Sequence, residues 1–578
     1  MKLAVSFVTA TILAQICPAG DRYLVTFKSD QGFQAMTNVM SSKSWAQGTP
    51  TPKALKFVRA VIMDGENAQV LESLKNHPEV LSVEKEFFVP SPKPISGFKI
   101  ARVPRPQMMV AEGGASIAAD ADDAVPVLRV GEATPWGIVA VKAGEAWAGS
   151  SAGAKSRVLV LDTGVDVTHP VIAGHFEKGK NFSADSQTGA VDPAAFADVE
   201  GHGTHVSGTI LGAYNETTGF TGVAPKAKLL MGRVCSQEGC SSIALLEGIN
   251  WGIEQHVDVM SMSLGGPMAS NAEANAMQAA EAAGIVVVAA SGNSGTEPTY
   301  SYDKKDPKCK SANPFQPINC GVSYPAAFPT VVAVGAVDST LVKTNFSQWG
   351  PELDVTAPGA AVISSVPMGT GRVSDVTLTL AGVPKKVKSA AFSGTQLFAT
   401  PLTNQIVVVP GMGRPTDYAT INVDGKFALI SRGEIKFAEK VKNAIDAKAV
   451  GVIIYNNTTG LMQGAVTEDG SLLSYPVVMI EQVEAQALIA ALAQATAVTA
   501  SISLSPSDYA SFDGTSMATP HVAGVVALIR SANKNLTPAQ VRLILTSTAI
   551  ALSPNDTNQF GAGIVQADKA VQAAIAQP

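Results

Sequence analysis

Short apolar runs of strand length alternate with longer helical stretches from Trp136 onward. Nearly continuous apolar strands joined by helices are typical of a parallel sheet covered by helices on both faces. Such three-layer α/β folds place their functional sites at the carboxyl ends of the strands. The runs are residues 158–161, 228–234, 257–262, 285–290 and 331–334, with helices expected over 242–255 and 271–283. We therefore expect chemistry-bearing residues directly after these runs.

This pattern stops near Val366 and returns only at about Asp508. The segment between them predicts its own core, with one amphipathic helix over 436–448. Its expected strands are 377–380, 406–409, 427–430, 450–455 and 477–480, and helices at 519–530 and 538–548 then return to the first pattern. The sequence thus predicts a mostly-β domain inserted into an α/β domain.

The N-terminal part divides into three segments. Residues 1–20 have a Lys flank, an apolar run and a Pro/Ala/Gly exit, which predicts a signal peptide and a chain that leaves the cytoplasm. Residues 21–90 predict a small α+β unit, and residues 91–133, rich in Pro, Gly, Ala and Ser without a period, predict a linker. Within the small unit, strands are expected at 23–27 and 80–89 and a helix at 68–75.

Charge and hydropathy exclude two classes of partner. Lys and Arg total 42 against 48 Asp and Glu, a formal net charge of −6 without long single-sign runs, so no basic surface is available for a nucleic acid backbone. Beyond the N-terminus no stretch of 18 apolar residues is uninterrupted, so we expect no membrane span. At 578 residues the chain is too long for one core and must fold as several domains.

Four cysteines remain once the signal segment is removed, an even number that suits disulfides in an exported protein. Short loops close at the lowest entropic cost, which favours pairing Cys235 with Cys240 and Cys309 with Cys320 among the three possible arrangements. A metal site is the competing interpretation, but no histidine lies at ligand spacing around these cysteines.

Three polar motifs follow apolar or glycine-rich segments. The first predicted strand ends in Asp162-Thr163-Gly164, His202 opens a small-residue helix within Gly201-His202-Gly203-Thr204-His205, and Ser516 does the same within Gly514-Thr515-Ser516-Met517-Ala518. Each motif alone is ordinarily a helix cap or a packed neighbour.

Together, in the order Asp, His, Ser, these motifs resemble the subtilase family of serine peptidases. The resemblance implies that Asp162, His202 and Ser516 form a catalytic triad. It also implies that Asn293, in Ser291-Gly292-Asn293-Ser294-Gly295, is the oxyanion donor. Further residues implied to bind substrate are Ser263, Leu264 and Gly265 along the peptide backbone and Ser323 at the floor of the specificity pocket.

The resemblance extends to the flanking domains. Residues 21–90 resemble the family's inhibitory propeptide, and Gly425 to Asn457 resemble the protease-associated (PA) domain found inside some subtilases. The implied organisation is a signal peptide (1–20), propeptide (21–90), linker (91–133), catalytic domain (134–368 and 507–578) and inserted PA domain (369–506). Self-cleavage is expected between about 89 and 132.

The implied function is a secreted, extracellular, periplasmic or cell-surface endopeptidase that is made as a zymogen. It would act as a monomer on proteins or peptides, with its own propeptide as intramolecular inhibitor and no catalytic cofactor. The resemblance leaves structural calcium open. Many family members bind it with an acidic residue directly after a His-Pro pair, whereas here His169-Pro170 is followed by Val171. The 214–220 loop still has a suitable length. A non-catalytic binding protein on the same scaffold is the alternative function, which a complete triad and oxyanion donor disfavour.

Overall fold

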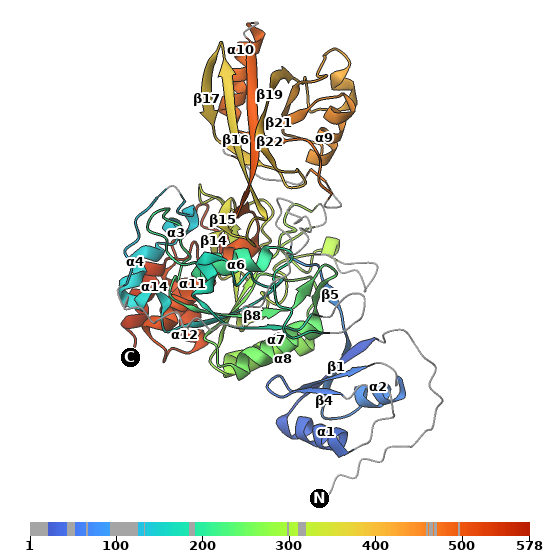
Figure 1. Cartoon of the computed structure of the whole chain (residues 1–578). Coiled ribbons are helices and arrows are strands. Elements are labelled where there is room, and N and C mark those ends of the chain that lie inside the picture. The colour runs from blue at the N-terminus through green and yellow to red at the C-terminus, as the bar shows by residue number, and fades with distance from the viewer. Residues whose placement is uncertain are drawn as a thin grey trace, which may run out of the picture.

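The computed structural model describes residues 21–42, 52–64, 68–92, 125–131, 133–183, 191–297, 300–309, 319–457, 461, 466–467, 471–494 and 497–578. Three bodies follow one another in Figure 1: a small N-terminal body, a central α/β body and an upper lobe formed by the insert. The predicted signal peptide, and most of the predicted linker, lie outside the described residues.

The central body is built on a seven-stranded sheet in the order β14-β13-β12-β11-β6-β8-β7, and every neighbouring pair is parallel. Its strands are β6 (Arg157–Asp162), β7 (Phe176–Asn181), β8 (Lys228–Arg233), β11 (Val259–Met262), β12 (Val286–Ala290), β13 (Val331–Val337) and β14 (Val355–Pro358). The parallel α/β fold expected from the apolar runs is confirmed.

Alternate residues of these strands enter two separate cores. Val158 and Val160 face a core shared with α6 and α11, whereas Leu159 and Leu161 face a core shared with α7 and α8. Because successive side chains of a strand point to opposite faces, this alternation explains why the strands are apolar throughout. The helices are α3 (Trp136–Ala140), α4 (Ala143–Ser150), α5 (Pro170–Ala173), α6 (His202–Leu211), α7 (Ser242–Glu254), α8 (Asn271–Ala282), α11 (Thr515–Ala532), α12 (Pro538–Thr548), α13 (Thr557–Phe560) and α14 (Ala567–Ile575).

The insert leaves and rejoins the central body through paired strands. Strand β15 (Val362–Ser365) pairs antiparallel with β24 (Tyr509–Phe512), and β16 (Gly371–Leu380) with β23 (Val498–Ser507). Its sheet runs β17-β16-β23-β19-β20-β21-β22-β18. The remaining elements are β17 (Val383–Val387), β18 (Ser389–Ala391), β19 (Phe398–Val408), β20 (Phe427–Ser431), α9 (Phe437–Asp446), β21 (Gly451–Tyr455), β22 (Val477–Ile480) and α10 (Gln482–Ala493).

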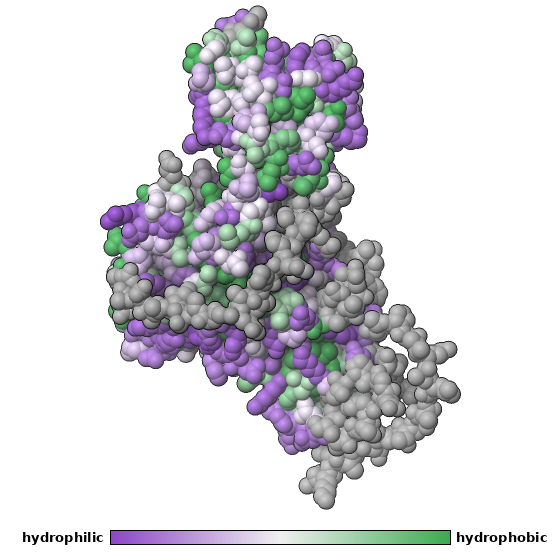
Figure 2. All heavy atoms as spheres, viewed as in Figure 1, coloured by the Kyte–Doolittle hydropathy of each residue, from purple (hydrophilic) through white to green (hydrophobic). Residues whose placement is uncertain are grey.

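The surface of the insert is not uniformly polar. Figure 2 shows apolar side chains among polar ones on its visible face, above the junction with the central body. Exposed large apolar side chains of the insert are Val373, Val383, Leu397, Leu472 and Val483.

The N-terminal body is a four-stranded antiparallel sheet in the order β2-β3-β1-β4. Leu24, Leu55 and Ile62 share the core of α7 and α8, so this sheet packs on the helices that cover one face of the central sheet. Its elements are β1 (Arg22–Phe27), α1 (Asp30–Ser42), β2 (Lys53–Leu55), β3 (Ala60–Asp64), α2 (Ala68–Lys75) and β4 (Val80–Lys85).

The structure contains elements that were not predicted, among them α1 and α10, and changes the bounds of others. Helix α11 begins at Thr515, at the serine motif, rather than at residue 519. The single strand expected over residues 80–89 is two strands, β4 and β5 (Phe88–Val89), and β5 pairs with the central body instead of its own sheet. The chain therefore leaves the N-terminal body along the surface of the central one.

Candidate active site

The carboxyl ends of β6 and β11 carry two predicted residues. The parallel register pairs Val160 with Ser261. Asp162 ends β6 and Ser263 directly follows β11, so both residues lie at the carboxyl edge of neighbouring parallel strands. This edge of the sheet is where the parallel fold was expected to hold its functional groups.

His202 is the first residue of α6 and contacts the carboxylate of Asp162. Its Nδ1 lies 2.8 Å from Asp162 Oδ1, and both side chains are buried. Gly201, at φ 86°, caps the helix and adopts the left-handed conformation that turns the chain into α6. Burial acts to lower the pKa of His202, but the negative charge of Asp162 and its hydrogen bond outweigh burial and raise this pKa. Asp162 therefore orients the ring and favours its protonated form.

Three other histidines, His169, His205 and His521, are also buried, and none of them meets a carboxylate within the described residues. His205 Nε2 lies 3.0 Å from the Val362 carbonyl, and His521 Nδ1 lies 2.8 Å from the Met517 carbonyl. Burial lowers the pKa of His205 to about 3 and that of His521 to about 4, so both are neutral. Of the two histidines in the Gly201-His202-Gly203-Thr204-His205 motif, the structure places only His202 against a carboxylate.

Ser516 lies in the first turn of α11 and is bonded to the end of β11. Its Oγ donates to the Ser263 carbonyl at 3.0 Å, and Ser263 Oγ donates to the Ser516 carbonyl at 2.8 Å. His202 Nε2 has no hydrogen-bond partner in the part of the chain that the structure describes. Ser516 Oγ is thus hydrogen-bonded to Ser263 rather than to this nitrogen, and such contacts are often incomplete outside the reactive complex.

Asn293 follows β12 and is held against the same helix start. Its Oδ1 accepts hydrogen bonds from the backbone N–H and the hydroxyl of Thr515, both at 2.9 Å. With the oxygen occupied, the amide NH₂ group is the end left to donate to another molecule. Gly292, at φ 106°, permits this turn, and a Cβ there would lie 2.0 Å from Gln348 Oε1.

The chain that leaves the N-terminal body runs into this site. Strand β5 pairs antiparallel with β10 (Gly239–Ser241), with Val89 opposite Cys240. A Cβ on Gly239 would lie 2.5 Å from the Val89 carbonyl, and one on Gly266 would lie 2.7 Å from the Val89 side chain. Val89 is therefore enclosed between β10 and the segment after β11.

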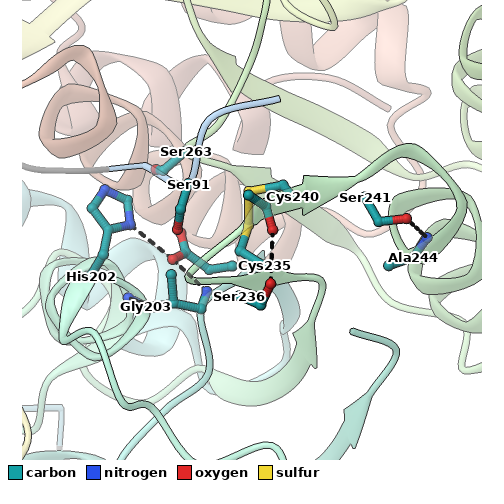
Figure 3. The surroundings of a disulfide bond; sticks show 12 residues. Ser91, His202, Gly203, Cys235, Ser236, Cys240, Ser241, Ala244 and Ser263 are labelled. Atoms are coloured by element: carbon teal, nitrogen blue, oxygen red, sulfur yellow. Dashed lines mark hydrogen bonds and ion pairs between the residues drawn. A yellow bond between two sulfur atoms is a disulfide. The ribbon is translucent and has the colours of Figure 1, made fainter. Parts of the chain in front are cut away.

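Two residues later, the tail lies beside the imidazole. Figure 3 shows Ser91 next to His202 and Ser263. Ser91 is buried, and its Oγ donates to Glu200 Oε2 at 2.9 Å. The end of the described N-terminal segment thus occupies the surface in front of the Asp162–His202 pair.

Two of the other predicted substrate-binding residues border this tail, and the third lies on an adjoining segment. Leu264 and Gly265 line a hollow together with Phe87 and Val89. Ser323 is buried, its N–H donates to Ser291, and the following Tyr324 forms a two-bond bridge with Gly266. Ser323 therefore precedes a residue that is bridged to the segment after β11, next to Gly265.

The four cysteines form two disulfides. Cys235 pairs with Cys240 across the hairpin of β9 (Cys235–Ser236) and β10, and Cys309 pairs with Cys320 in the loop before Ser323. The first bridge therefore supports the strand on which β5 lies.

Sequence reasoning missed two acidic residues just before His202. The Asp198 carboxylate accepts from Thr163, Thr204 and the backbone N–H groups of Glu200 and Gly201, which fixes the loop that enters α6. Glu200 meets Ser91, as described above. The signal available was the Asp198-Val199-Glu200 segment directly upstream of the histidine motif.

The described residues contain neither a metal-binding cluster nor a helix that could cross a membrane. They hold no group of three or more His, Cys, Asp or Glu side chains that could bind a metal ion. Asn215, in the loop considered for calcium, accepts from the N–H groups of Thr217 and Thr218 within its own turn. In the same part of the chain no helix has the length and apolar character needed to cross a membrane.

A parallel α/β sheet whose edge joins a buried Asp–His pair to a serine at a helix start defines a serine peptidase of the subtilisin-like class. The subtilase family model matches residues 153–408 and 471–563, and the PA domain model matches residues 399–488. The chain belongs to the subtilase family and is a serine endopeptidase.

Individual relatives agree with this assignment. Subtilisin DY of Bacillus licheniformis is 36% identical over 244 residues, covering 41% of this chain and 77% of that protein. The major intracellular serine protease of Bacillus subtilis is 39% identical over 235 residues, covering 40% and 67%. Among solved structures, the psychrophilic subtilisin-like protease Apa1 from Pseudoalteromonas sp. AS-11 is 27% identical with a TM-score of 0.55, over 77% of this chain and all of that one.

Proposed function

We propose that Ser516 is the nucleophile, His202 the general base and Asp162 the group that orients the imidazole. A serine hydroxyl is a weak nucleophile unless a neighbouring base takes its proton. His202 Nε2 would accept the Ser516 proton as Oγ attacks the peptide carbonyl and would deliver it to the leaving amine. The observation that carries this proposal is the 2.8 Å contact between His202 Nδ1 and Asp162, because it leaves Nε2 free for that exchange.

Attack would place a negative charge on the carbonyl oxygen. The Asn293 amide and the Ser516 backbone N–H are the proposed donors, and the positive end of α11 adds to their effect. Because Thr515 holds Asn293 Oδ1, the donor would be in place before the reaction and need not reorganise.

Substrate would lie as an added strand where β5 now lies. The pairing of β5 with β10, and the enclosure of Val89, support this position. Residues 263–265 would then border the other edge of the substrate strand, and Ser323 would lie at the pocket for the residue that carries the attacked carbonyl.

We also propose that residues 21–90 inhibit the enzyme in its precursor and that the enzyme removes them itself. The buried contact of Ser91 in front of His202 supports inhibition, because a substrate would meet an occupied surface. The signal-peptide pattern of residues 1–20 supports export to the cell exterior.

The test compares the wild-type precursor with Ser516→Ala and with Ser547→Ala, a control at an exposed serine of α12. Each purified protein is incubated alone and followed by mass measurement, N-terminal sequencing and casein hydrolysis. Wild type and the control should lose the N-terminal segment at one site between residues 89 and 132 and hydrolyse casein. Ser516→Ala should remain intact and inactive. An isolated Ser516→Ala protein that still loses the segment would contradict self-processing by this serine.

A further inference from the structure

The side chain of Glu200 faces the occupied cleft with only one of its two carboxylate oxygens in a hydrogen bond. Oε2 accepts from Ser91 Oγ at 2.9 Å. Oε1 is buried and has no partner in the part of the chain that the structure describes. An ionised carboxylate has about four acceptor positions, so a single neutral hydroxyl leaves most of its capacity unsatisfied.

The loop before α6 does not need this carboxylate for its own fold. Asp198 supplies the bonds that hold the loop, including those to the N–H groups of Glu200 and Gly201. The hydrogen bond that the structure gives to the Glu200 side chain instead crosses to the N-terminal tail, 109 residues away in sequence. This carboxylate therefore faces whatever chain occupies the cleft beside His202.

The surroundings of Glu200 favour a positively charged occupant. Burial is the largest cause that raises the pKa of Glu200, and the charges of Asp198 and Asp162 add to it, whereas the hydrogen bond from Ser91 and the charge of His202 lower it. The net shift of this pKa is upward, so Ser91 and His202 do not fully compensate the buried carboxylate. A lysine or arginine at the position of Ser91 would bring a compensating charge and several N–H donors to the free oxygen. Serine brings one donor and no charge.

We propose that Glu200 is a specificity-determining residue that selects a basic side chain at the substrate position occupied by Ser91. This inference rests on the proposed function, in which a substrate strand follows the path of the N-terminal tail. Figure 3 draws Ser91 near His202. In that path the selected side chain would lie on the side of the scissile bond that becomes the acyl-enzyme.

Matched peptide substrates test the proposal on the wild-type processed enzyme. One series places lysine, and the other norleucine, at each position in turn from the fourth to the first residue before the scissile bond. Norleucine has nearly the same aliphatic stem as lysine but no charge. At one position lysine should raise kcat/KM about ten- to a hundredfold, the size expected for a hydrogen bond to a charged group. Equal values at all positions would overturn the proposal.

Variants then assign the preference to one carboxylate. Glu200→Gln should bring the lysine-to-norleucine ratio at that position close to one, and Glu200→Asp should retain part of it. Glu238→Gln removes an exposed carboxylate from the β9–β10 turn, at the same cleft edge, and should leave the ratio unchanged. An unchanged ratio in Glu200→Gln, or an equal fall in Glu238→Gln, refutes the role of Glu200. Failure of the wild type to cleave either series would instead refute the proposed substrate path.

Discussion

Replacing Gly239 by alanine should weaken the binding of an extended substrate strand. Gly239 has φ 133°, a conformation that side chains rarely adopt, and a Cβ there would lie 2.5 Å from the Val89 carbonyl. The chain beside β10 must therefore move away by about 1 Å to reach ordinary van der Waals distance. Such a shift would break the pairing of β5, and of a substrate in its place, with β10.

The magnitude follows from the hydrogen bonds at stake. A short antiparallel pairing of this kind contributes about two backbone hydrogen bonds, each worth about 1 kcal/mol. Their loss corresponds to a roughly thirtyfold rise in KM when KM reflects binding. The backbone strain at positive φ, about 1–2 kcal/mol, acts on folding and must be measured separately.

The assay compares a peptide that spans four residues before the scissile bond with a single-residue ester. Gly239→Ala should raise KM for the peptide and leave the ester nearly unaffected, because the ester does not reach β10. Gly284→Ala is the matched control: it has φ 81°, but nothing lies within 4 Å of its added Cβ. Thermal unfolding of both variants measures the strain alone. An unchanged peptide KM in a folded Gly239→Ala enzyme would refute the proposed strand pairing.

Two further predictions concern single side chains. Asn293→Ala should lower kcat about 10²- to 10³-fold with little change in KM, a loss of the size measured for one oxyanion donor in this family; an unchanged kcat would remove Asn293 from the mechanism. Burial, and then the charge of Glu84, raise the pKa of Glu273 to about 8, so Glu273 is neutral below this pH and repels Glu84 above it. Limited proteolysis of the Ser516→Ala precursor should therefore release residues 21–90 faster at pH 9 than at pH 7, and Glu273→Gln, but not Glu281→Gln at the far end of α8, should abolish the difference.

The contact between Glu84 and the start of α8 also shows how the N-terminal body is held on the central body. The Glu84 carboxylate accepts from the hydroxyl of Ser270 and the N–H of Asn271, at the start of α8. Glu86 likewise accepts from Ser241, which caps α7. Carboxylates at helix N-termini are stabilising because they meet unpaired N–H groups and the positive end of the helix dipole. Ionisation of Glu273 in the first turn of α8 would oppose this contact.

Local pattern was sufficient for much of the fold. Runs such as residues 158–161 are apolar because a central parallel strand is buried on both faces, so their class could be predicted without any knowledge of their neighbours. Helix α10 was missed for the opposite reason: its apolar and alanine residues lack a clear period, and only contact with the insert's core distinguishes Ala485 and Leu488 as buried. The disulfide pairing could be predicted because short loop closure is a property of spacing along the chain.

The sequence by itself determined the class of protein, because the three motifs and the strands before them are each local and each readable. The tertiary structure alone decided that β5 leaves its own sheet for β10 and that Glu200 faces the tail rather than its own loop, whereas the contact of His202 with Asp162 had been expected from the motifs. These contacts join residues between 40 and more than 150 positions apart. Spacing and periodicity describe what one segment can become, whereas a contact between distant segments depends on the surfaces that both present after folding.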